Sequence, residues 1–245
     1  MWYRVLQFLT GVLAPMQMRL RVVHRDAIPA KGPVLLVSNH LGITDPLVIA
    51  MPLRRTVHIL AKAEIFSWPV LGWLARKAGV VPVHRGEADR GALRTLSQLL
   101  ADKECVLVFP EGTYHYPPES PGMLPLKTGA AWLALRTGAL VVPVAIWGTE
   151  LVWEPARGWR PWYHPTVHVV FGEPYHPKLP SSGSSKQALD IVTAEMARKI
   201  ADLLPLRYRG EYAPELREAV SAAANSRGGR LTATSELEDQ IQGDQ

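Results

Sequence analysis

The sequence predicts an α/β fold: a single layered domain with a central, largely parallel sheet flanked by helices. Three observations predict this class. Apolar, β-rich runs alternate with helical stretches along most of the chain, as in folds built from alternating strands and helices. Several runs are almost continuously apolar, which is typical of parallel strands buried on both faces. At 245 residues with 47% hydrophobic content, the chain is long enough for one sizeable core.

Residues 1–25 form a separate segment that we expect to be a membrane-associated helix. MWYRVLQFLTGVLAP is mostly apolar with aromatic residues at its tip, and MQMRLRVV adds Arg19 and Arg21. This composition predicts an amphipathic interfacial helix whose arginines face anionic lipid, and a helix packed on the domain's own core is the alternative. A secretory signal is disfavoured because the small-residue site near Ala14 precedes a proline. No segment has the ~20 apolar residues that span a bilayer.

The elements of the main domain are predicted within residues 26–205. Strands are expected where β-branched and apolar residues cluster, at 34–39, 57–60, 79–84, 105–110, 140–147 and 166–172. Helices are expected where apolar residues recur at helical spacing, at 46–53, 69–79, 89–103, 129–138 and, after a Ser/Gly linker, 186–204. Residues 206–245 are polar with little periodicity, and we predict a flexible C-terminal tail there.

A formal charge of +5 suggests an anionic partner without identifying it. No run of Lys and Arg is typical of a nucleic-acid arm, and the tryptophans do not alternate with basic residues, so nucleic acid is not expected. The one cysteine, Cys105, cannot form an internal disulfide and lies in an apolar strand. This pattern favours a reducing, cytosolic setting and an inert thiol.

A polar turn follows the first predicted strand and contains His40, and Asp45 precedes Pro46 where the next helix begins. Asp45 has a structural explanation, because a carboxylate there caps free helix amides. His40 has none, and it lies at the carboxyl end of a parallel strand, where open α/β sheets bind ligands. A carboxylate from the same turn orients the ring and supports the imidazolium, as a general base requires. Local chemistry alone leaves catalysis and a plain turn both open.

Motifs for other kinds of chemistry are missing from the sequence. It contains no G-x-S-x-G elbow, no H-E-x-x-H or C-x-x-C set, and no glycine-rich nucleotide loop. We therefore expect no metal and no cofactor. The remaining interpretation is a base that activates a substrate hydroxyl for direct transfer.

Two further turns favour a phosphate-bearing substrate. VVPVHRG ends a strand with Arg85, and VLVFPEGTYHY ends another with Glu111, Gly112 and Thr113. An arginine makes bidentate contacts with phosphate, and a glycine permits close backbone approach. The alternative for Arg85 is an ordinary surface charge. Two lysines are further candidates to bind the substrate: Lys62 and Lys127.

Four blocks of the sequence, taken in order, resemble those of the glycerolipid acyltransferase family, which includes 1-acylglycerol-3-phosphate acyltransferase and has an HxxxxD motif. They are NHLGITD, GVVPVHRG, FPEGT and VVPVAI. The resemblance implies transfer of a fatty acyl group from acyl-CoA or acyl carrier protein to the hydroxyl of a lysophospholipid, in phospholipid biosynthesis. It also implies a peripheral protein bound to the phospholipid surface on the cytoplasmic face of the cell membrane.

The same resemblance implies roles for individual residues. His40 is similar to the family's base, and Asp45 to the aspartate that orients it. Arg85 matches the arginine that binds the acceptor phosphate. Glu111 and Gly112 match the glutamate and glycine of the acceptor site.

One position departs from the family pattern, because Tyr114 follows FPEGT where members often have an arginine. The missing arginine removes one fork-shaped phosphate contact. Either Arg85 and Lys127 suffice for lysophosphatidate, or the acceptor has another head group, such as that of an amino-acid lipid. An acyl-thioester hydrolase or a lipid-binding protein on the same fold is the alternative from another class.

Overall fold

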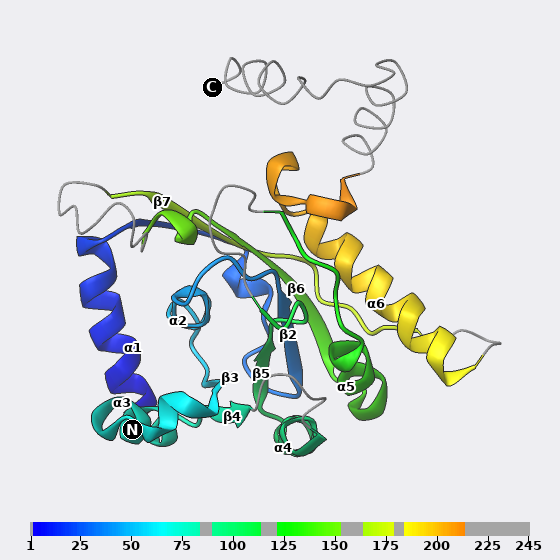
Figure 1. The fold of residues 1–245 in the computed structure, drawn as a ribbon, viewed down its shortest axis with the longest axis horizontal. Helices are drawn as coiled ribbons and strands as arrows, with labels where there is room; N and C mark the ends of the chain where they lie inside the picture. Colours follow the sequence, from blue (N-terminus) through cyan, green and yellow to red (C-terminus); the bar gives the residue numbers. More distant parts are fainter. Residues whose placement is uncertain (1, 84–89, 114–121, 153–163, 179–183, 214–245) are drawn as a thin grey trace, which may run out of the picture.

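The structure, a computed structural model, describes residues 2–83, 90–113, 122–152, 164–178 and 184–213. Within these ranges the strands form one seven-stranded sheet in the order β1-β7-β6-β2-β5-β3-β4, which is seen nearly edge-on in Figure 1. The strands are β1 (Arg19–Val23), β2 (Val34–Ser38), β3 (Val57–Lys62), β4 (Val81–Val83), β5 (Cys105–Val108), β6 (Leu140–Trp147) and β7 (Thr166–Phe171). The predicted α/β class is therefore confirmed.

The central strands of the sheet run in one direction. β6, β2, β5, β3 and β4 pair in parallel, whereas β7 is antiparallel to β6 and β1 is parallel to β7. The carboxyl ends of the five parallel strands therefore meet at one edge of the sheet. This is the edge at which parallel α/β sheets bind ligands.

Helices cover both faces of the sheet (Figure 1). They are α1 (Trp2–Leu13), α2 (Asp45–Ala50), α3 (Pro69–Lys77), α4 (Arg90–Ala101), α5 (Gly129–Thr137) and α6 (Ser185–Ala201). Helices α4, α5 and α6 share one apolar core with alternate residues of β2, including Leu35 and Val37. Helix α2 packs with Val34 and Leu36 on the opposite face. Because both faces of β2 are buried, its sequence is a continuous apolar run.

The sheet begins earlier in the chain than the predicted boundary at residue 26. The N-terminal helix ends at Leu13, and β1 then pairs with β7 from Arg19↔Thr166 to Val23↔Val170. Its side chains alternate between exposed and half-buried, because an edge strand covers the core with only one face. Part of the segment that we predicted to be interfacial is thus a strand of the domain.

The first residues of the predicted C-terminal tail are packed rather than flexible. Two short 3-10 turns cover Leu206–Tyr208 and Gly210–Tyr212, and Tyr208 is 2% exposed. The hydroxyl of Tyr208 donates to Glu150 at 2.7 Å, and its carbonyl accepts the Met123 amide at 3.0 Å. The buried aromatic ring is the physical reason why this part of the tail stays ordered. The rest of the predicted tail, residues 214–245, lies outside the described residues.

Helix α1 contacts the domain through polar side chains and exposes apolar ones. Gln7 donates to the carbonyls of Met51 and Leu53, at 2.9 and 2.6 Å, just beyond α2. Phe8 is 70% exposed, and Val5 and Val12, on the same face by their spacing, are also exposed. Helix α1 therefore does both things that we considered as alternatives: it docks on the domain, and it presents an apolar face to the outside. Among the residues that the structure describes, no helix has both the length and the hydropathy needed to cross a bilayer.

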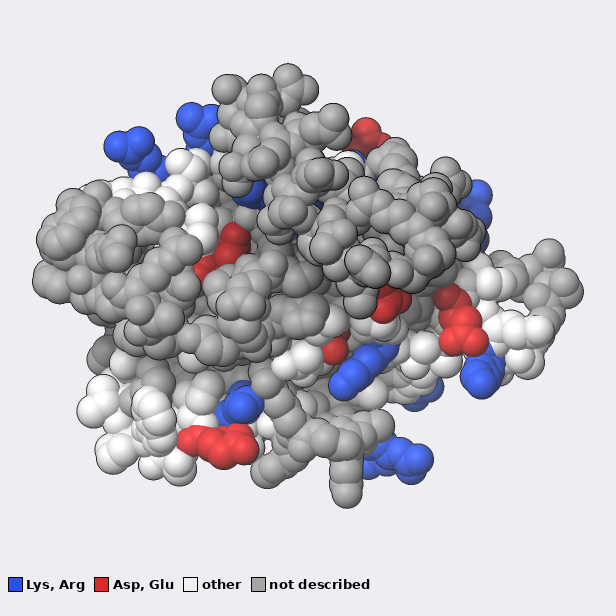
Figure 2. All heavy atoms as spheres, turned by 45° about the horizontal axis from the view of Figure 1, so that its top comes forward, with Lys and Arg blue, Asp and Glu red and all other residues white. Residues whose placement is uncertain are grey.

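Charges of both signs are scattered over one face of the molecule. In Figure 2 the basic and acidic side chains of the described residues lie interspersed, without a broad field of one sign on the visible part of that face. The net positive charge is therefore not explained by a single basic surface there.

Candidate active site at the carboxyl end of β2

The chain leaves β2 at a fixed point because Asn39 is anchored to the neighbouring strand. Its side-chain amide donates to the Ile146 carbonyl at 2.8 Å, and its Oδ1 accepts the Ile146 amide at 2.9 Å. Asn39 is fully buried, and this pair of bonds extends the connection between β2 and β6 one residue past the end of β2. The next residue, His40, therefore begins at a defined place on the carboxyl edge.

His40 and Asp45 are in direct contact. The His40 Nδ1 and Asp45 Oδ2 lie 2.8 Å apart, and both side chains are buried, at 9% and 0% exposed. The same Oδ2 accepts the backbone amides of Leu41 and Gly42 at 2.6 and 2.9 Å. An ionised carboxylate accepts hydrogen bonds only, so Nδ1 carries a proton and Nε2 is the basic nitrogen of the neutral ring. This is the arrangement of a general base with an orienting carboxylate.

Asp45 does not cap its helix in the way we predicted. The N-cap of α2 is Thr44, without a side-chain hydrogen bond, and Pro46 occupies the first turn. The Asp45 carboxylate instead turns back to the amides of Leu41 and Gly42, which precede the helix. The reason is geometric: folding back closes the turn around the carboxylate and brings it to the His40 ring.

Two residues after β5 hold His40 from the other side. The Phe109 ring stacks on the imidazole, with ring centroids 4.1 Å apart and an interplanar angle of 24°. Glu111 accepts the His40 backbone amide at 2.9 Å through Oε1 and the Leu124 amide at 3.0 Å through Oε2. The backbone, the ring plane and the Nδ1 atom of His40 are thus each held by a different contact. A base held in this way loses little conformational entropy when it acts.

Burial is the main cause that raises the pKa of Glu111, to about 7. The amides of Leu124 and His40 lower the pKa, and the nearby Asp45 charge raises it. Glu111 is 4% exposed, so its charge is poorly solvated. The carboxyl group therefore changes its protonation state near neutral pH, directly behind the His40 backbone.

This raised pKa predicts a pH-dependent stability. Between pH 4.5 and about 7 the folded chain retains a proton on Glu111 that the unfolded chain has lost, so the free energy of unfolding falls as the pH rises. The slope from this group reaches at most about 1.4 kcal/mol per pH unit. In Glu111→Gln it is expected to disappear, and urea unfolding of both proteins at several pH values measures the difference. The same pH dependence in both proteins would contradict the prediction.

Of the other predicted site residues, those that the structure describes lie at the same edge of the sheet as His40 and Asp45. Gly112 has a φ of +72°, and an ideal Cβ there would lie 2.7 Å from the Lys127 Nζ, so the ammonium lies directly over this glycine. Thr113 is exposed beside it, and Lys62 is exposed at the end of β3. The structure thus brings together His40, Asp45, Glu111, Gly112 and Lys127. Arg85 and Tyr114 lie outside the described residues.

Two residues of the site were not predicted from the sequence. Asn39 positions the backbone and Phe109 positions the ring, and both stand inside the blocks NHLGITD and FPEGT. A buried amide directly after an apolar strand was a signal for Asn39, since such a group needs partners. Nothing in the local sequence indicates that Phe109 stacks on His40, because that contact depends on the pairing of β2 with β5.

Cys105 is buried in β5, and burial raises the pKa of its thiol to about 12. A protonated thiol inside a strand is not a nucleophile, so the structure agrees with the inert interpretation. In the described part of the chain, no three His, Cys, Asp or Glu side chains are grouped so that they could hold a metal ion.

The chain is similar to proteins of one family. A family model described as Acyltransferase matches residues 19–147, just over half of the chain. Over 185 residues the chain is 26% identical to the 1-acyl-sn-glycerol-3-phosphate acyltransferase of Bacillus subtilis, covering 75% of this chain and 87% of the relative. Over 124 residues it is 38% identical to the lyso-ornithine lipid O-acyltransferase of Pseudomonas aeruginosa, covering 47% of this chain and 43% of that relative.

A solved structure has the same fold. The crystal structure of the 1-acyl-sn-glycerophosphate acyltransferase PlsC from Thermotoga maritima matches with a TM-score of 0.62 and 24% sequence identity, covering 82% of this chain and 79% of that one. At this identity the likeness concerns the fold alone. It agrees with the layered architecture described above.

Proposed function

The chain belongs to the acyltransferase family, and we propose that it transfers a fatty acyl group from an acyl thioester to the free hydroxyl of a lysophospholipid. The first candidate acceptor is 1-acylglycerol-3-phosphate, the substrate named for the Bacillus subtilis relative. The observation that carries the proposal is the 2.8 Å contact between His40 and a carboxylate that two backbone amides hold in place.

In the proposed reaction the His40 Nε2 takes the proton from the acceptor hydroxyl while its oxygen attacks the thioester carbonyl. The new C–O bond gives a tetrahedral oxyanion, which collapses with cleavage of the C–S bond. The imidazolium then returns its proton to the leaving thiolate. Asp45 stabilises the imidazolium between these steps, because its carboxylate lies on Nδ1. No protein nucleophile is needed, so the acyl group passes directly from sulfur to oxygen.

Two different acceptors have support, one from a charge at this edge of the sheet and one from the sequence. A phosphate on the acceptor would pair with the exposed Lys127 ammonium, which lies over Gly112, and this supports 1-acylglycerol-3-phosphate. The tyrosine at position 114, where related proteins often have an arginine, and the 38% identity to the lyso-ornithine lipid enzyme favour an amino-acid lipid as the second candidate. The two head groups differ in charge, so an acceptor panel separates them.

The experiment is an acyl transfer assay with radiolabelled acyl-CoA or acyl carrier protein and several lysolipids, read by lipid chromatography. The proposal predicts labelled phosphatidate as the main product from lysophosphatidate. A stronger signal with a lyso-ornithine lipid would select the second acceptor. Labelled free fatty acid in every arm, without any ester product, would overturn the proposed transfer.

We place this activity at the membrane surface, in the peripheral position on the cytoplasmic face that the resemblance implies. The support is an apolar platform of exposed side chains on α1 and around α3, which are in contact with each other. We define the platform by these residues: Val5, Phe8, Val12, Trp68, Val70 and Trp73. Trp68 and Val70 are 61% and 72% exposed, and Arg76 and Lys77 follow in the last turn of α3. Exposed tryptophan with neighbouring basic residues is typical of a surface that binds anionic lipid.

The platform predicts the effect of adding charge to it. Phe8→Glu and Trp68→Glu are each expected to weaken binding to anionic phospholipid vesicles about tenfold or more, because each removes a large side chain from the lipid. Vesicle co-sedimentation measures this. Ile191→Glu on α6, where Ile191 is 53% exposed, is the matched control and should bind normally. Equal binding by all three variants would contradict the membrane role of the platform.

A further inference from the structure

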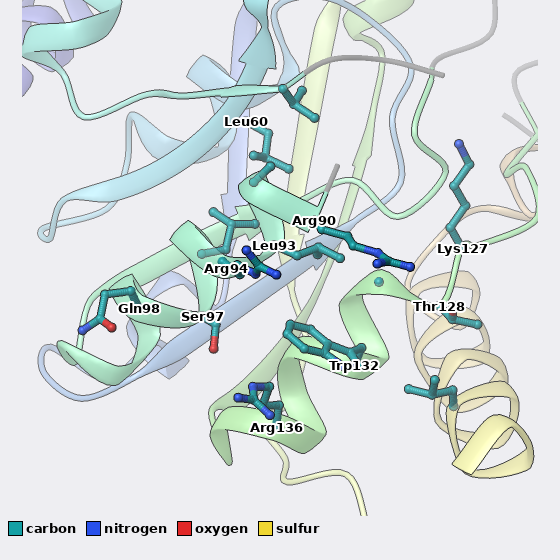
Figure 3. A pocket seen from close by; sticks show the side chains of 15 residues that line it. Leu60, Arg90, Leu93, Arg94, Ser97, Gln98, Lys127, Thr128, Trp132 and Arg136 are labelled. Carbon is teal, nitrogen blue, oxygen red and sulfur yellow. The ribbon is translucent and has the colours of Figure 1, made fainter. Parts of the chain in front are cut away.

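A cavity of about 820 Å³ lies between α4 and α5, outside the contacts that hold His40 (Figure 3). Lys127 and Thr128 line it at the start of α5, and Arg90 lines it at the start of α4. The apolar part of its wall comes from Leu60, Val83, Ala92, Leu93, Leu96, Trp132 and Leu189. A volume of this size is typical of sites for small molecules. The proposed reaction at His40 gives a role to Lys127 alone among the residues that line this cavity.

The described residues that line the cavity include basic side chains but no acidic ones. Arg90, Arg94, Lys127 and Arg136 are among the lining residues, all four are exposed, and none of the described lining residues is Asp or Glu. Within the described ranges, no ion pair joins any of the four to a carboxylate. Four cations around one concave site attract an anionic ligand, and arginine favours phosphate in particular.

The cavity also offers an aromatic surface. The half-buried indole of Trp132 lies between the arginines of α4 and Arg136 in Figure 3, and the Arg136 guanidinium is 5.5 Å from its ring centroid. Indole rings stack with heteroaromatic bases, and arginine on the same ring adds a cation–π contribution. A ligand that combines phosphates with a base therefore fits the lining better than a simple phosphate.

The cations extend too far from the reacting centre to serve only the acceptor. The Lys127 amide donates to the Pro110 carbonyl at 2.8 Å, so α5 begins at the catalytic edge, and it ends at the start of β6 on the opposite edge. Arg136, seven residues after Gly129, lies about 10 Å along the helix from its first residue. In lysophosphatidate only two carbons separate the attacking hydroxyl from the phosphate ester. The acceptor phosphate therefore reaches Lys127 and not Arg136.

We propose that this cavity binds the nucleotide end of acyl-CoA, an inference that rests on the proposed acyl transfer. The adenine stacks on Trp132, the phosphates contact Arg90, Arg94 and Arg136, and the pantetheine arm runs past Lys127 toward His40. An acyl carrier protein supplies the same arm and one phosphate but no nucleotide. The cavity thus assigns the donor as the CoA thioester.

A binding experiment without catalysis tests the site. Adenosine 3′,5′-bisphosphate, which has no thioester, is titrated into the full chain by calorimetry. We expect binding to the unmodified protein and a loss of about tenfold or more in Arg94→Glu and Arg136→Glu, since each removes a charge-assisted contact. Trp132→Leu should also weaken binding. Arg198→Glu, at an exposed position on α6, is the matched control and should bind normally. Absence of binding, or equal binding by all variants, overturns the proposal.

Steady-state kinetics separates this site from the proposed function. Arg94→Glu and Arg136→Glu are expected to raise the KM for acyl-CoA about tenfold and to leave the KM for the acceptor unchanged. A rise in the acceptor KM alone, or an equal defect with acyl carrier protein as donor, overturns the nucleotide assignment. If the nucleotide binds as predicted but no acceptor is esterified, the nucleotide site stands and the proposed transfer fails.

Discussion

Replacing His40 with alanine is expected to lower the rate of acyl transfer by ~10²–10⁴-fold while the fold stays intact. In the proposed reaction the His40 ring is the base, and alanine removes the Nε2 atom that would take the proton. The backbone amide that donates to Glu111 is retained, and Asp45 Oδ2 still accepts the amides of Leu41 and Gly42. Transfer rates and circular dichroism melting curves of both proteins measure the two expectations.

His58→Ala is the matched control for this experiment. The His58 ring is half-buried in β3, with Nδ1 2.9 Å from the Gly79 carbonyl, and has no described contact with the His40 pair. The His58→Ala variant should therefore have the same rate of acyl transfer per folded molecule as the unmodified protein. If His40→Ala transfers acyl groups at the normal rate, or if His58→Ala loses as much activity, the proposed mechanism is wrong.

Replacing Asp45 with asparagine is expected to lower kcat by ~10²–10⁴-fold with little change in either KM. Asparagine has nearly the same shape and retains one oxygen acceptor, but it lacks the negative charge that supports the imidazolium in the proposed reaction. Its amide group can also donate to Nδ1, which places the ring proton on Nε2 and removes the base. Steady-state kinetics over a range of both substrates separates kcat from KM.

Asp45→Ala distinguishes the orienting role from a structural one. Alanine leaves the Leu41 and Gly42 amides without their acceptor, so this variant should also lose about 2 kcal/mol or more of unfolding free energy.

Asp102→Asn, at an exposed carboxylate that accepts from Gln98, is the control for the Asp45→Asn substitution. An Asp45→Asn protein with normal kcat would show that the carboxylate has no part in the reaction.

Much of the sheet could be predicted because its strands are buried on both faces. The runs at β2, β5 and β6 are apolar throughout, and parallel strands between two helical layers have this pattern. β1 was missed because its sequence, RLRVV, alternates arginine with apolar residues. We interpreted those arginines as lipid-facing charges. Only the pairing with β7, far along the chain, identifies the segment as an edge strand.

The contact between His40 and Asp45 could be predicted because it is local. The two residues are five positions apart in one turn, so the chain between them can bring them together in few ways. Glu111 was predicted as a site residue from its turn after an apolar strand, and the family resemblance added a place in the acceptor site, but its contact with the His40 backbone was not predicted. That bond joins residues 71 positions apart. Its donor is a backbone amide, a group that every residue except proline has. No sequence pattern distinguishes one such amide from another.

The cavity between α4 and α5 could not be predicted for a related reason. Arg90 and Arg94 belong to one helix, and Trp132 and Arg136 to another, in two separate stretches of sequence. In each helix alone, exposed arginines look like solvated surface charges. Only the packing of α4 beside α5 on the same face of the sheet brings the four cations around one volume.

The most direct test of acyl transfer by the His40 and Asp45 pair compares thiol release with ester formation in a single reaction. Unmodified protein is incubated with acyl-CoA, with and without lysophosphatidate, while free thiol is followed by absorbance and phosphatidate by chromatography. We predict that thiol release depends on the acceptor and equals the phosphatidate formed, mole for mole. Thiol release at the same rate without any acceptor would contradict this account and identify water as the group that His40 activates.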